Sequence, residues 1–406
     1  MTAHEDGYRY APADSPAGLI ERGRGLGALR ARGEPAAARA AVLDCLRTDT
    51  RWDWQVDQRH HYLAHLVREL ALPIDLPVTL LDGTDQDNWR SHGLLAVLAR
   101  TGSTEARAAL RRYVRRGGEW WQGVLDTVAD EWPTPWWDDL RADALRLLAG
   151  AEPEHPDSAC WPHWGLAVPA APPPPRPARA PAEPAALLAV LADPDAPRRD
   201  RAAALRSLGD GPGAPELLPL VPQLWTCYPG SPDSFPLPHL GRALERLGPL
   251  ALAPAREWVA SGAPWLAGLG LGVLAGHGTA ADLPLLLADL ARSWADRRWC
   301  ALDWLADGLS RFGPAAGEAA PLLHLFWSET PHSYERLSYL RALTAIAPAS
   351  TAPLLHEALW DCESNVRRFA LEHAPDGPEL LSRAAELRDS PVEPPEVRAA
   401  AARRAG

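Results

Sequence analysis

The sequence predicts an all-α protein, an α-solenoid of stacked antiparallel helical hairpins. Three observations lead to this prediction. A Pro-Leu-Leu phrase returns through the second half of the chain at steps of roughly thirty-odd residues, a period typical of two-helix repeats. Hydrophobic residues make up 47% of the chain, in long runs rich in Ala, Leu and Arg that favour helix. Apolar helical stretches alternate with acidic turns and with helices that begin at Arg. Such a hairpin is too small to bury its apolar face alone, so we expect neighbours to stack.

The repeated phrase gives the expected order of hairpins in the second half. It begins at Pro184, Pro215, Pro284, Pro321 and Pro353, with leucine pairs at 187–188, 217–218, 285–286, 322–323 and 354–355. Pro249 and Leu250 supply a degenerate midpoint in the longest interval. Each phrase therefore predicts one helical hairpin of the stack.

The first half predicts a separate set of helices. We expect a short helical pair, then a longer helix at 52–72, another that begins near Trp89 after the capping side chains of 85–88, and three more helices. The pair covers 16–32 and 35–47, and the last three cover 103–116, 120–130 and 135–148. In the second half, Gly268, Gly272 and Gly276 predict close helix approach along one face.

Composition predicts four parts. Residues 1–150 form an N-terminal helical block, and 185–390 form a C-terminal repeat block. The stretch 151–184 is so rich in proline that it is not helical and acts as a linker or surface loop. Residues 391–406 are expected to be a flexible tail.

The most regular turn lies between the helices at 354–361 and 366–373. Asp361, Asn365, Val366, Arg367, Ala370 and Leu371 stand where the HEAT-repeat family has its turn acid, its Val-Arg pair and its packing residues. The chain therefore resembles HEAT-repeat proteins over about two thirds of its length. The resemblance implies an α-solenoid and marks a fold, not an activity. Arg198, Arg297 and Arg367, near the starts of second helices, are expected to reach turn carboxylates such as Asp361 as a structural ladder.

Charge and composition exclude several functions. The chain contains no lysine, which excludes Schiff-base catalysis and the phosphate loop that ends in Gly-Lys. A net charge of −11 opposes non-specific binding to nucleic acid. The five cysteines never form a Cys-x-x-Cys pair, as expected of reduced thiols. The N-terminus lacks signal-peptide character and no apolar run approaches a membrane span, so we expect a cytoplasmic protein without cofactors.

A helix face carries the one candidate metal site. Asp57, His61 and His65 step by four residues through the helix expected at 52–72, a spacing that places three ligands on one face. The ordinary alternative is that these side chains are solvated. The glutamate of a zinc-protease helix is missing, because Tyr62 follows His61.

A second candidate combines arginine and tryptophan. One helix carries five arginines, and a tryptophan-rich span follows it; this surface is the predicted partner-binding site. Its residues are Arg107, Arg111, Arg112, Arg115, Arg116, Trp120, Trp121, Trp136 and Trp137. Arginine and tryptophan are enriched in binding hot spots. The alternatives are a solvated helix face and indoles that fill the core.

The sequence leaves two functions open. The first is a non-catalytic scaffold or adaptor that binds a protein partner on a concave surface, without cofactor and without nucleic acid. The second rests on the segment Trp299 to Trp304, which resembles the Trp and catalytic Asp of HEAT-like alkylpurine DNA glycosylases. That resemblance would make Asp303 the catalytic carboxylate and place Trp299 and Trp304 against the damaged base. The negative net charge favours the scaffold, because phosphate contacts dominate DNA affinity.

Overall fold

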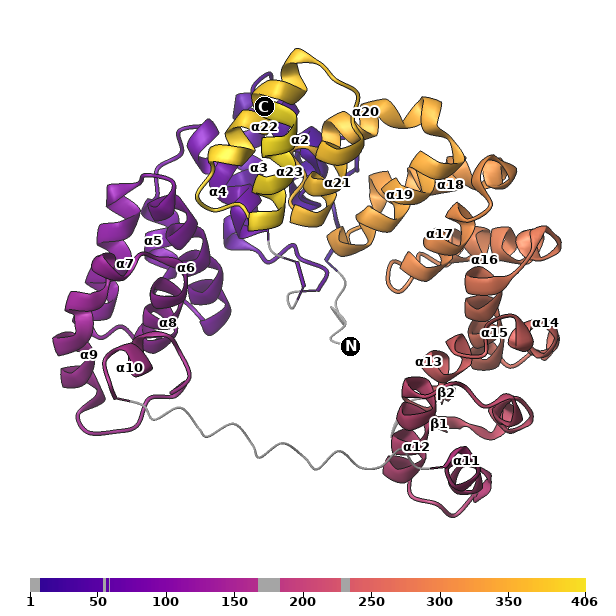
Figure 1. Ribbon diagram of the computed structural model, residues 1–406. Coiled ribbons are helices and arrows are strands. Elements are labelled where there is room, and N and C mark those ends of the chain that lie inside the picture. The colour runs from indigo at the N-terminus through magenta and orange to yellow at the C-terminus, as the bar shows by residue number, and fades with distance from the viewer. Residues whose placement is uncertain (1–7, 54–55, 58, 167–182, 228–233) are drawn as a thin grey trace. The chain divides into compact units, whose positions relative to one another are not determined.

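The computed structural model describes residues 8–53, 56–57, 59–166, 183–227 and 234–406. The regular structure in these ranges is nearly all helical, which confirms the predicted all-α class (Figure 1). Within the described ranges, the only strands are β1 (Trp225–Cys227) and β2 (Ser234–Pro236), which pair antiparallel with Thr226 opposite Phe235. No described helix is both long enough and apolar enough to cross a bilayer. All five cysteines are free, and three of them are buried.

The chain divides into two compact units that do not follow the sequence order. Unit 1 comprises Met1–Pro173, Ser328–Leu340 and Ala349–Gly406, and unit 2 comprises Pro174–Trp327 and Arg341–Pro348. Residues 185–390, expected as one block, are therefore shared between the two units. Residues 167–182 of the predicted Pro-rich linker lie outside the described residues. The expectation of no helix is wrong for the part before them, which contains α10 (Cys160–His163).

The N-terminal part of unit 1 is a series of short helices. They are α1 (Pro16–Glu21), α2 (Gly25–Ala31), α3 (Pro35–Arg47), α4 (His60–Glu69), α5 (Asp75–Leu80), α6 (Asp85–Arg100), α7 (Thr104–Arg116), α8 (Trp121–Glu131), the 3₁₀ turns η1 (Thr134–Trp136) and η2 (Asp138–Leu140), α9 (Arg141–Leu148) and α10 (Cys160–His163). The helix expected to begin near Trp89 is α6, but it begins earlier, at Asp85, because Thr84 caps it through a capping box with Asp87. The helix expected at 52–72 is wrong at its start. It begins only at His60, because Asp57 and Arg59 pair with each other in the irregular segment before it.

The C-terminal part of unit 1 contributes further helices. They are η7 (Ser333–Glu335), the start of α19 (Arg336–Ile346), α20 (Pro348–Ala358), α21 (Ser364–His373), α22 (Pro378–Asp389) and α23 (Pro395–Ala405). Side chains of α4 and α22 line one cavity, so the N-terminal and C-terminal parts of unit 1 meet there. The expected flexible tail is instead α23, which packs on α21 and α22. Val397 and Ala401 are buried there, and this burial holds the segment as a helix.

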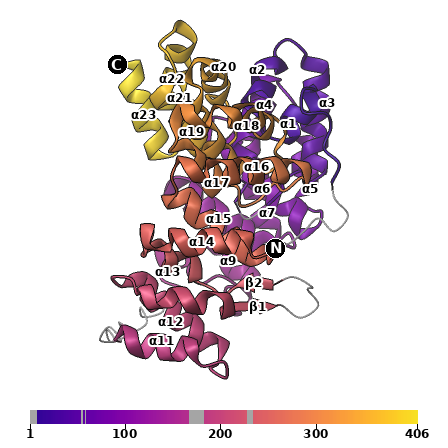
Figure 2. The same cartoon turned by 90° about the vertical axis from the view of Figure 1, so that its right-hand side faces the viewer.

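Unit 2 is a succession of helices in sequence order (Figure 2). They are α11 (Pro184–Ala192), α12 (Arg198–Asp210), η3 (Pro215–Gln223), α13 (Leu240–Glu245), η4 (Gly248–Ala251), α14 (Leu252–Ala260), α15 (Pro264–His277), η5 (Ala280–Asp282), α16 (Leu283–Ala295), α17 (Asp303–Ser310), η6 (Gly313–Ala319) and most of α18 (Ala320–Glu329). Helix α11 packs on α12, α12 on α13, α14 on α15, and α15 on α17.

The Pro-Leu-Leu phrase does mark helix starts. Pro184 and Pro215 open α11 and η3, and Pro284 lies in the first turn of α16. Pro353 departs from the pattern, since it lies inside α20. In α16 the second leucine of the pair, Leu286, is fully buried, whereas Leu285 is 37% exposed. One leucine of the pair therefore anchors this helix in the core.

The glycines of α15 do not act as the sequence predicts. A Cβ atom added to Gly268, Gly272 or Gly276 would meet no atom within 4 Å, so these positions leave open space. The close approach occurs at Gly270 instead, where an added Cβ would lie 2.6 Å from the backbone oxygen of Ala255 in α14. The spacing of four identified a real face of the helix, but the wrong one.

Candidate functional site

The turn between α1 and α2 connects the N-terminal part of unit 1 to its C-terminal part, and we call this connection the joint. Arg24, only 5% exposed, donates from Nε and Nη2 to the two carboxylate oxygens of Glu357 at 2.8 Å each. Arg22 donates from Nε to the backbone oxygen of Glu329 at 3.0 Å. Bidentate pairs of this kind fix geometry as well as charge. The first helices of the chain are therefore bonded to residues more than three hundred positions later in the sequence.

Two glycines make this turn possible. Gly23 has φ of +65°, and an added Cβ would lie 2.6 Å from Sγ of Cys362. An added Cβ on Gly25 would lie 1.9 Å from the backbone oxygen of Glu357. The amide of Cys362 donates to the backbone oxygen of Gly23 at 3.0 Å. Any side chain at either glycine would push the two segments apart.

The next contacts extend the same joint toward α21. Arg336 is fully buried and forms a bidentate pair with Asp361. Its Nη1 also donates to the backbone oxygen of Arg22 at 2.8 Å. Arg367 donates from Nη2 to Glu393 at 2.7 Å and from Nη1 to the backbone oxygens of Asp361 and Cys362. Arg367 thus reaches its own turn through two backbone carbonyls, and its carboxylate partner is Glu393.

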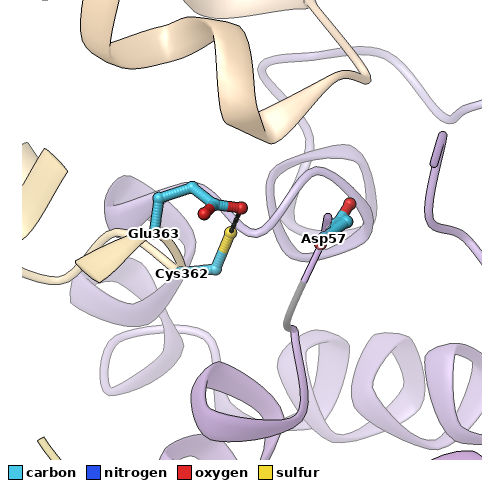
Figure 3. A group of neighbouring side chains, drawn as sticks. All are labelled: Asp57, Cys362 and Glu363. Atoms are coloured by element: carbon cyan, nitrogen blue, oxygen red, sulfur yellow. Dashed lines mark hydrogen bonds between the residues drawn. The ribbon is translucent and has the colours of Figure 1, made fainter. Parts of the chain in front are cut away.

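Asp57, Cys362 and Glu363 meet at the centre of this joint (Figure 3). Their donor atoms lie within 4.8 Å of one another, the only such group of three metal-ligating side chains among the described residues. Arg59 already pairs with Asp57 at 2.7 Å, and Arg336 donates to the sulfur of Cys362 at 3.2 Å. Two guanidinium groups thus supply the positive charge that a metal would bring. We interpret the group as a charge-balanced core.

Burial raises the pKa values of the acidic groups in this core. Burial, followed by the charge of Asp57, raises the pKa of Glu363 to about 7, although Ser333 donates to its carboxylate at 2.6 Å. Burial also raises the pKa of Asp57, against the opposing effect of Arg59. The pKa of the Cys362 thiol lies well above its usual value for the same reason. This thiol is therefore not poised as a nucleophile.

A cavity of unit 1 lies beside this joint and has a volume of about 730 Å³. Its wall comes from α4, from the end of α6 with the turn after it, and from the segment 360–393 that includes α22. Trp360 and Val392 give it apolar surface, and both pack against the core of unit 1. Size and mixed lining are those of a ligand site.

The carboxylates that line the cavity are all paired with arginines, but two of the lining arginines are not paired with carboxylates. Every lining carboxylate already has an arginine partner: Glu69 with Arg32, Asp361 with Arg336, Glu386 with Arg383, Asp389 with Arg388, and Glu393 with Arg367. By contrast, the side chain of Arg68 makes no hydrogen bond or ion pair with any described residue, and the guanidinium of Arg100 donates only to the backbone oxygen of Pro391. Arg100 also lies in the last turn of α6, where a cation complements the helix dipole. The uncommitted charge of the cavity is therefore positive.

His61 and His65 line the same wall from α4. Burial, followed by the charges of Arg367 and Arg100, lowers the pKa of His61 to about 4. Burial, followed by the charge of Arg383, lowers the pKa of His65 to about 4 as well. Neither imidazole is hydrogen-bonded to a described residue, and Nδ1 of His61 is buried without a partner. Both rings are neutral at neutral pH, with hydrogen-bonding capacity to spare.

The predicted metal site is therefore corrected. Asp57 precedes α4 and is turned into the charge-balanced core, where Arg59 holds it, so it does not share a face with the two histidines. His61 and His65 do share a face, as their spacing predicts, but this face lines the cavity and is not solvated like an ordinary outer surface. What the sequence presented as a ligand triad is a pair of cavity histidines.

A smaller cavity of about 110 Å³ lies on another side of α4. His60 and His92 line it, with Glu131 and Trp89. The side-chain nitrogen of Asn88 donates to the backbone oxygen of Leu81, which leaves its side-chain oxygen to accept from Nδ1 of His92 at 2.9 Å. His92 is thereby held as the Nδ1–H tautomer. With a volume of about 110 Å³, this cavity can hold only a very small molecule or water.

The arginines of α7 are bonded mostly within unit 1. Arg111 and Arg115 both pair with Asp139, at 2.6 and 2.9 Å, and Arg116 pairs with Asp82. Arg107 lies over the ring of Trp136, 4.6 Å from its centroid. Arg112 is exposed. Most of the positive charge expected for a partner is thus balanced by neighbouring aspartates.

The tryptophans after α7 fill the core of unit 1. Trp137 and Trp164 pack edge to face at 5.6 Å, and Trp161 is fully buried against Trp164. The predicted contact residues Trp120 and Trp121 are half-buried. The indole nitrogen of Trp120 donates to the backbone oxygen of Gly83 at 3.4 Å, and the ring of Trp121 lies edge-on to that of Trp161. Core packing therefore accounts for most of this cluster.

The glycosylase-like segment lies in unit 2. Asp303 is the first residue of α17, and both Trp299 and Trp304 are half-buried. Trp299 packs edge to face on Trp294 at 5.8 Å and on Phe326 at 5.9 Å. Its ring is thus a packing element. None of the three predicted catalytic residues lines either of the two cavities described above.

The arginines expected to form a ladder have different surroundings. Arg198 opens α12, as predicted. Arg297 adopts a left-handed backbone with φ of 53° and lies over the rings of Trp294 and Trp299. Its neighbour Arg298 pairs with Asp289 at 3.0 Å.

Several arginines of the joint and of the cavity wall have no distinguishing sequence pattern. They are Arg22, Arg24, Arg59, Arg68, Arg100 and Arg336. In a chain with 41 basic residues, all arginine, none of these stands out by type. The one local signal was the run Arg22-Gly23-Arg24-Gly25, in which glycines alternate with arginines next to a helix start.

Comparison with known proteins gives no relative for this chain. No family model matches it, and no curated protein and no solved structure is significantly similar to it.

Proposed function

We propose that the protein is a non-catalytic, cytoplasmic adaptor of HEAT-like α-solenoid construction, and that the large cavity of unit 1 receives a segment of a protein partner. The observation that carries the proposal is the cavity itself. It has a volume of about 730 Å³, both apolar and charged walls, and donors left without acceptors. Peptide segments are recognised by such a mixture of surfaces.

The chemistry of the wall supports binding over catalysis. The lining holds three hydroxyl side chains, those of Tyr62, Thr101 and Ser390. No described histidine forms a hydrogen bond to Ser390. The carboxylates of the lining are held by arginines, which lowers their capacity to act as general bases. A catalytic nucleophile with an oriented base is therefore not assembled among the described lining residues.

The succession of helices in unit 2 supports the HEAT-like part of the proposal. Helices there pack on near neighbours in sequence order, and Pro at helix starts recurs with the repeat period. Arginine-to-acid pairs occur from one helix pair to the next, for example Arg256 with Asp282 at 2.7 Å and Arg242 with Asp210 at 2.6 Å. Repeat proteins bind partners over extended surfaces of this kind.

A comparative pull-down tests the proposal. The full chain, immobilised, should recover one defined protein in stoichiometric amount from an extract of its host. Replacing Arg68 and Arg100 together by Glu should remove that protein, because the cavity then repels what it had attracted. Arg112→Glu on α7 is the matched control and should retain it, since Arg112 is exposed and lies outside the cavity.

Four results would overturn the proposal. Loss of the partner with Arg112→Glu, and not with the cavity variant, would assign binding to the arginine helix predicted from the sequence. Recovery of DNA without a stoichiometric protein would favour the glycosylase, as would base-excision activity abolished by Asp303→Asn. A partner retained by both variants would exclude the cavity.

A further inference from the structure

We infer that the cavity recognises carboxylate side chains of an acidic peptide segment, which dock against Arg68, Arg100, His61 and His65. This inference rests on the proposed function and specifies the chemistry of the partner. The four side chains share one cavity wall, and none of them is bonded to a carboxylate of the described protein. They come from α4 and from the last turn of α6.

Charge accounting favours an anion at this wall. The lining holds five arginines and five carboxylates, which would cancel if every arginine had an acidic partner. Asp361 and Asp389 take their arginine partners, Arg336 and Arg388, from outside the lining. Two lining arginines, Arg68 and Arg100, are thereby left over. Charge-assisted bonds from guanidinium to carboxylate are among the strongest that a partner offers.

The paired carboxylates favour a carboxylate over a phosphate. A dianion would sit beside Glu69 and Glu393, whose negative charges are compensated but close. Single negative charges spaced along a peptide can each meet one free guanidinium and avoid these groups. The protein also carries a net charge of −11, so an acidic peptide gains nothing from bulk attraction. Binding of such a peptide would therefore report a local site.

The two histidines couple this site to protons. Their charged and titratable neighbours come from every element around the cavity. These are Arg68 and Glu69 on α4, Arg100 on α6, Arg32 after α2, Asp361 before α21, Arg367 on α21, Arg383, Glu386 and Asp389 on α22, and Glu393 before α23. Burial and these arginines keep both rings neutral in the free protein. A bound carboxylate stabilises the imidazolium, so the complex takes up protons as the pH falls and affinity rises.

Peptide binding to the full chain provides the test. The probe is a fluorescent peptide of ten glutamates, followed by fluorescence anisotropy at pH 7.5 and 5.5, with a peptide of ten glutamines as its neutral counterpart. We expect saturable binding of the glutamate peptide alone. Arg68→Gln and Arg100→Gln should each weaken it on the order of tenfold, the loss typical of one charge-assisted contact.

Two controls separate the site from general electrostatics and from misfolding. Arg398→Gln removes an exposed arginine of α23 outside the cavity and should leave affinity unchanged. The side chain of Arg68 has no hydrogen-bond or ion-pair partner among the described residues, so Arg68→Gln should unfold at the same temperature as the parent protein. The double variant His61→Gln with His65→Gln should still bind at pH 7.5 but should lose the gain in affinity at pH 5.5.

The outcomes are distinct. Equal binding of the glutamine peptide, or equal weakening by Arg398→Gln, would overturn the inference. A phosphoserine peptide that binds where the glutamate peptide does not would also overturn it and assign the wall to phosphate. If cavity variants lose the partner in the pull-down while no acidic peptide binds, the proposed function stands and the carboxylate class fails.

Discussion

The guanidinium of Arg336 and the carboxylate of Asp361 face each other in a bidentate pair, with both nitrogen–oxygen distances at 2.9 Å. The side chains of both residues have no exposed surface. Arg336 also holds the backbone oxygens of Arg22 and Gly23, and the amide of Glu363 donates to Asp361. The pair therefore connects the turn between α1 and α2 to the segment that precedes α21.

Removing one partner of this pair should destabilise unit 1 strongly. We expect Arg336→Ala to lower the free energy of unfolding by about 3–5 kcal/mol, because it leaves a buried carboxylate without compensation. Urea denaturation followed by circular dichroism measures this loss. Arg336→Met combined with Asp361→Leu should cost less than the single change, since no charge remains buried. If the single variant kept the parent stability, the pair would not be buried as described.

The close contact at Gly25 gives a second prediction. Gly25→Ala should cost about 2 kcal/mol or more, because its Cβ would overlap the backbone oxygen of Glu357. Gly123→Ala in α8 is the matched control, since its Cβ would meet nothing within 4 Å. In a helix that substitution should stabilise by roughly 0.5–1 kcal/mol. Thermal unfolding of both variants should therefore shift in opposite directions.

The lowered pKa values of four histidines predict sensitivity to acid. Burial lowers the pKa to about 3 for His60 and to about 4 for His61, His65 and His92. Between pH 6.5 and 4 the unfolded chain binds protons that the folded protein does not, so stability should fall as the pH falls. The double variant His61→Gln with His65→Gln should show a smaller fall in denaturation midpoint from pH 7 to pH 5. An unchanged slope would contradict the burial of these two rings.

Glu363 should act in the opposite direction. Its pKa of about 7 lies above that of an ordinary glutamate, so the folded protein retains a proton that the unfolded chain releases. This contribution is present below about pH 4.5 and is lost as the pH rises through 7, by at most about 1.4 kcal/mol per pH unit. Glu363→Gln should remove it. The stability difference between variant and parent, measured by urea denaturation at pH 5.5 and 7.5, should therefore favour the variant more at the higher pH.

Local features of the fold were predictable from the sequence. Proline at a helix start has a reason within its own helix, so Pro184 and Pro284 could be placed without any knowledge of tertiary contacts. The four-residue step from His61 to His65 likewise fixed a shared helix face. What that face meets was not predictable, because the opposite wall of the cavity comes from residues 360–393.

The joint itself was beyond local pattern analysis. Glu357 is the partner of Arg24 only because the two segments meet in space, and any of the many acids of the chain has the same local appearance. Arg297 illustrates the same limit at short range. Its backbone is left-handed, which residue type alone does not indicate.

The contacts of Arg22 and Arg24 also bear on biosynthesis. A ribosome delivers α1 and α2 first, but their acceptors, near residues 328 and 357, emerge only when most of the chain has been translated. Until then, the guanidinium groups of Arg22 and Arg24 and the glycine turn lack the residues that they contact in the folded protein. We therefore expect the nascent N-terminal segment to remain incompletely folded during translation, and fragments that end before residue 328 to depend on chaperones.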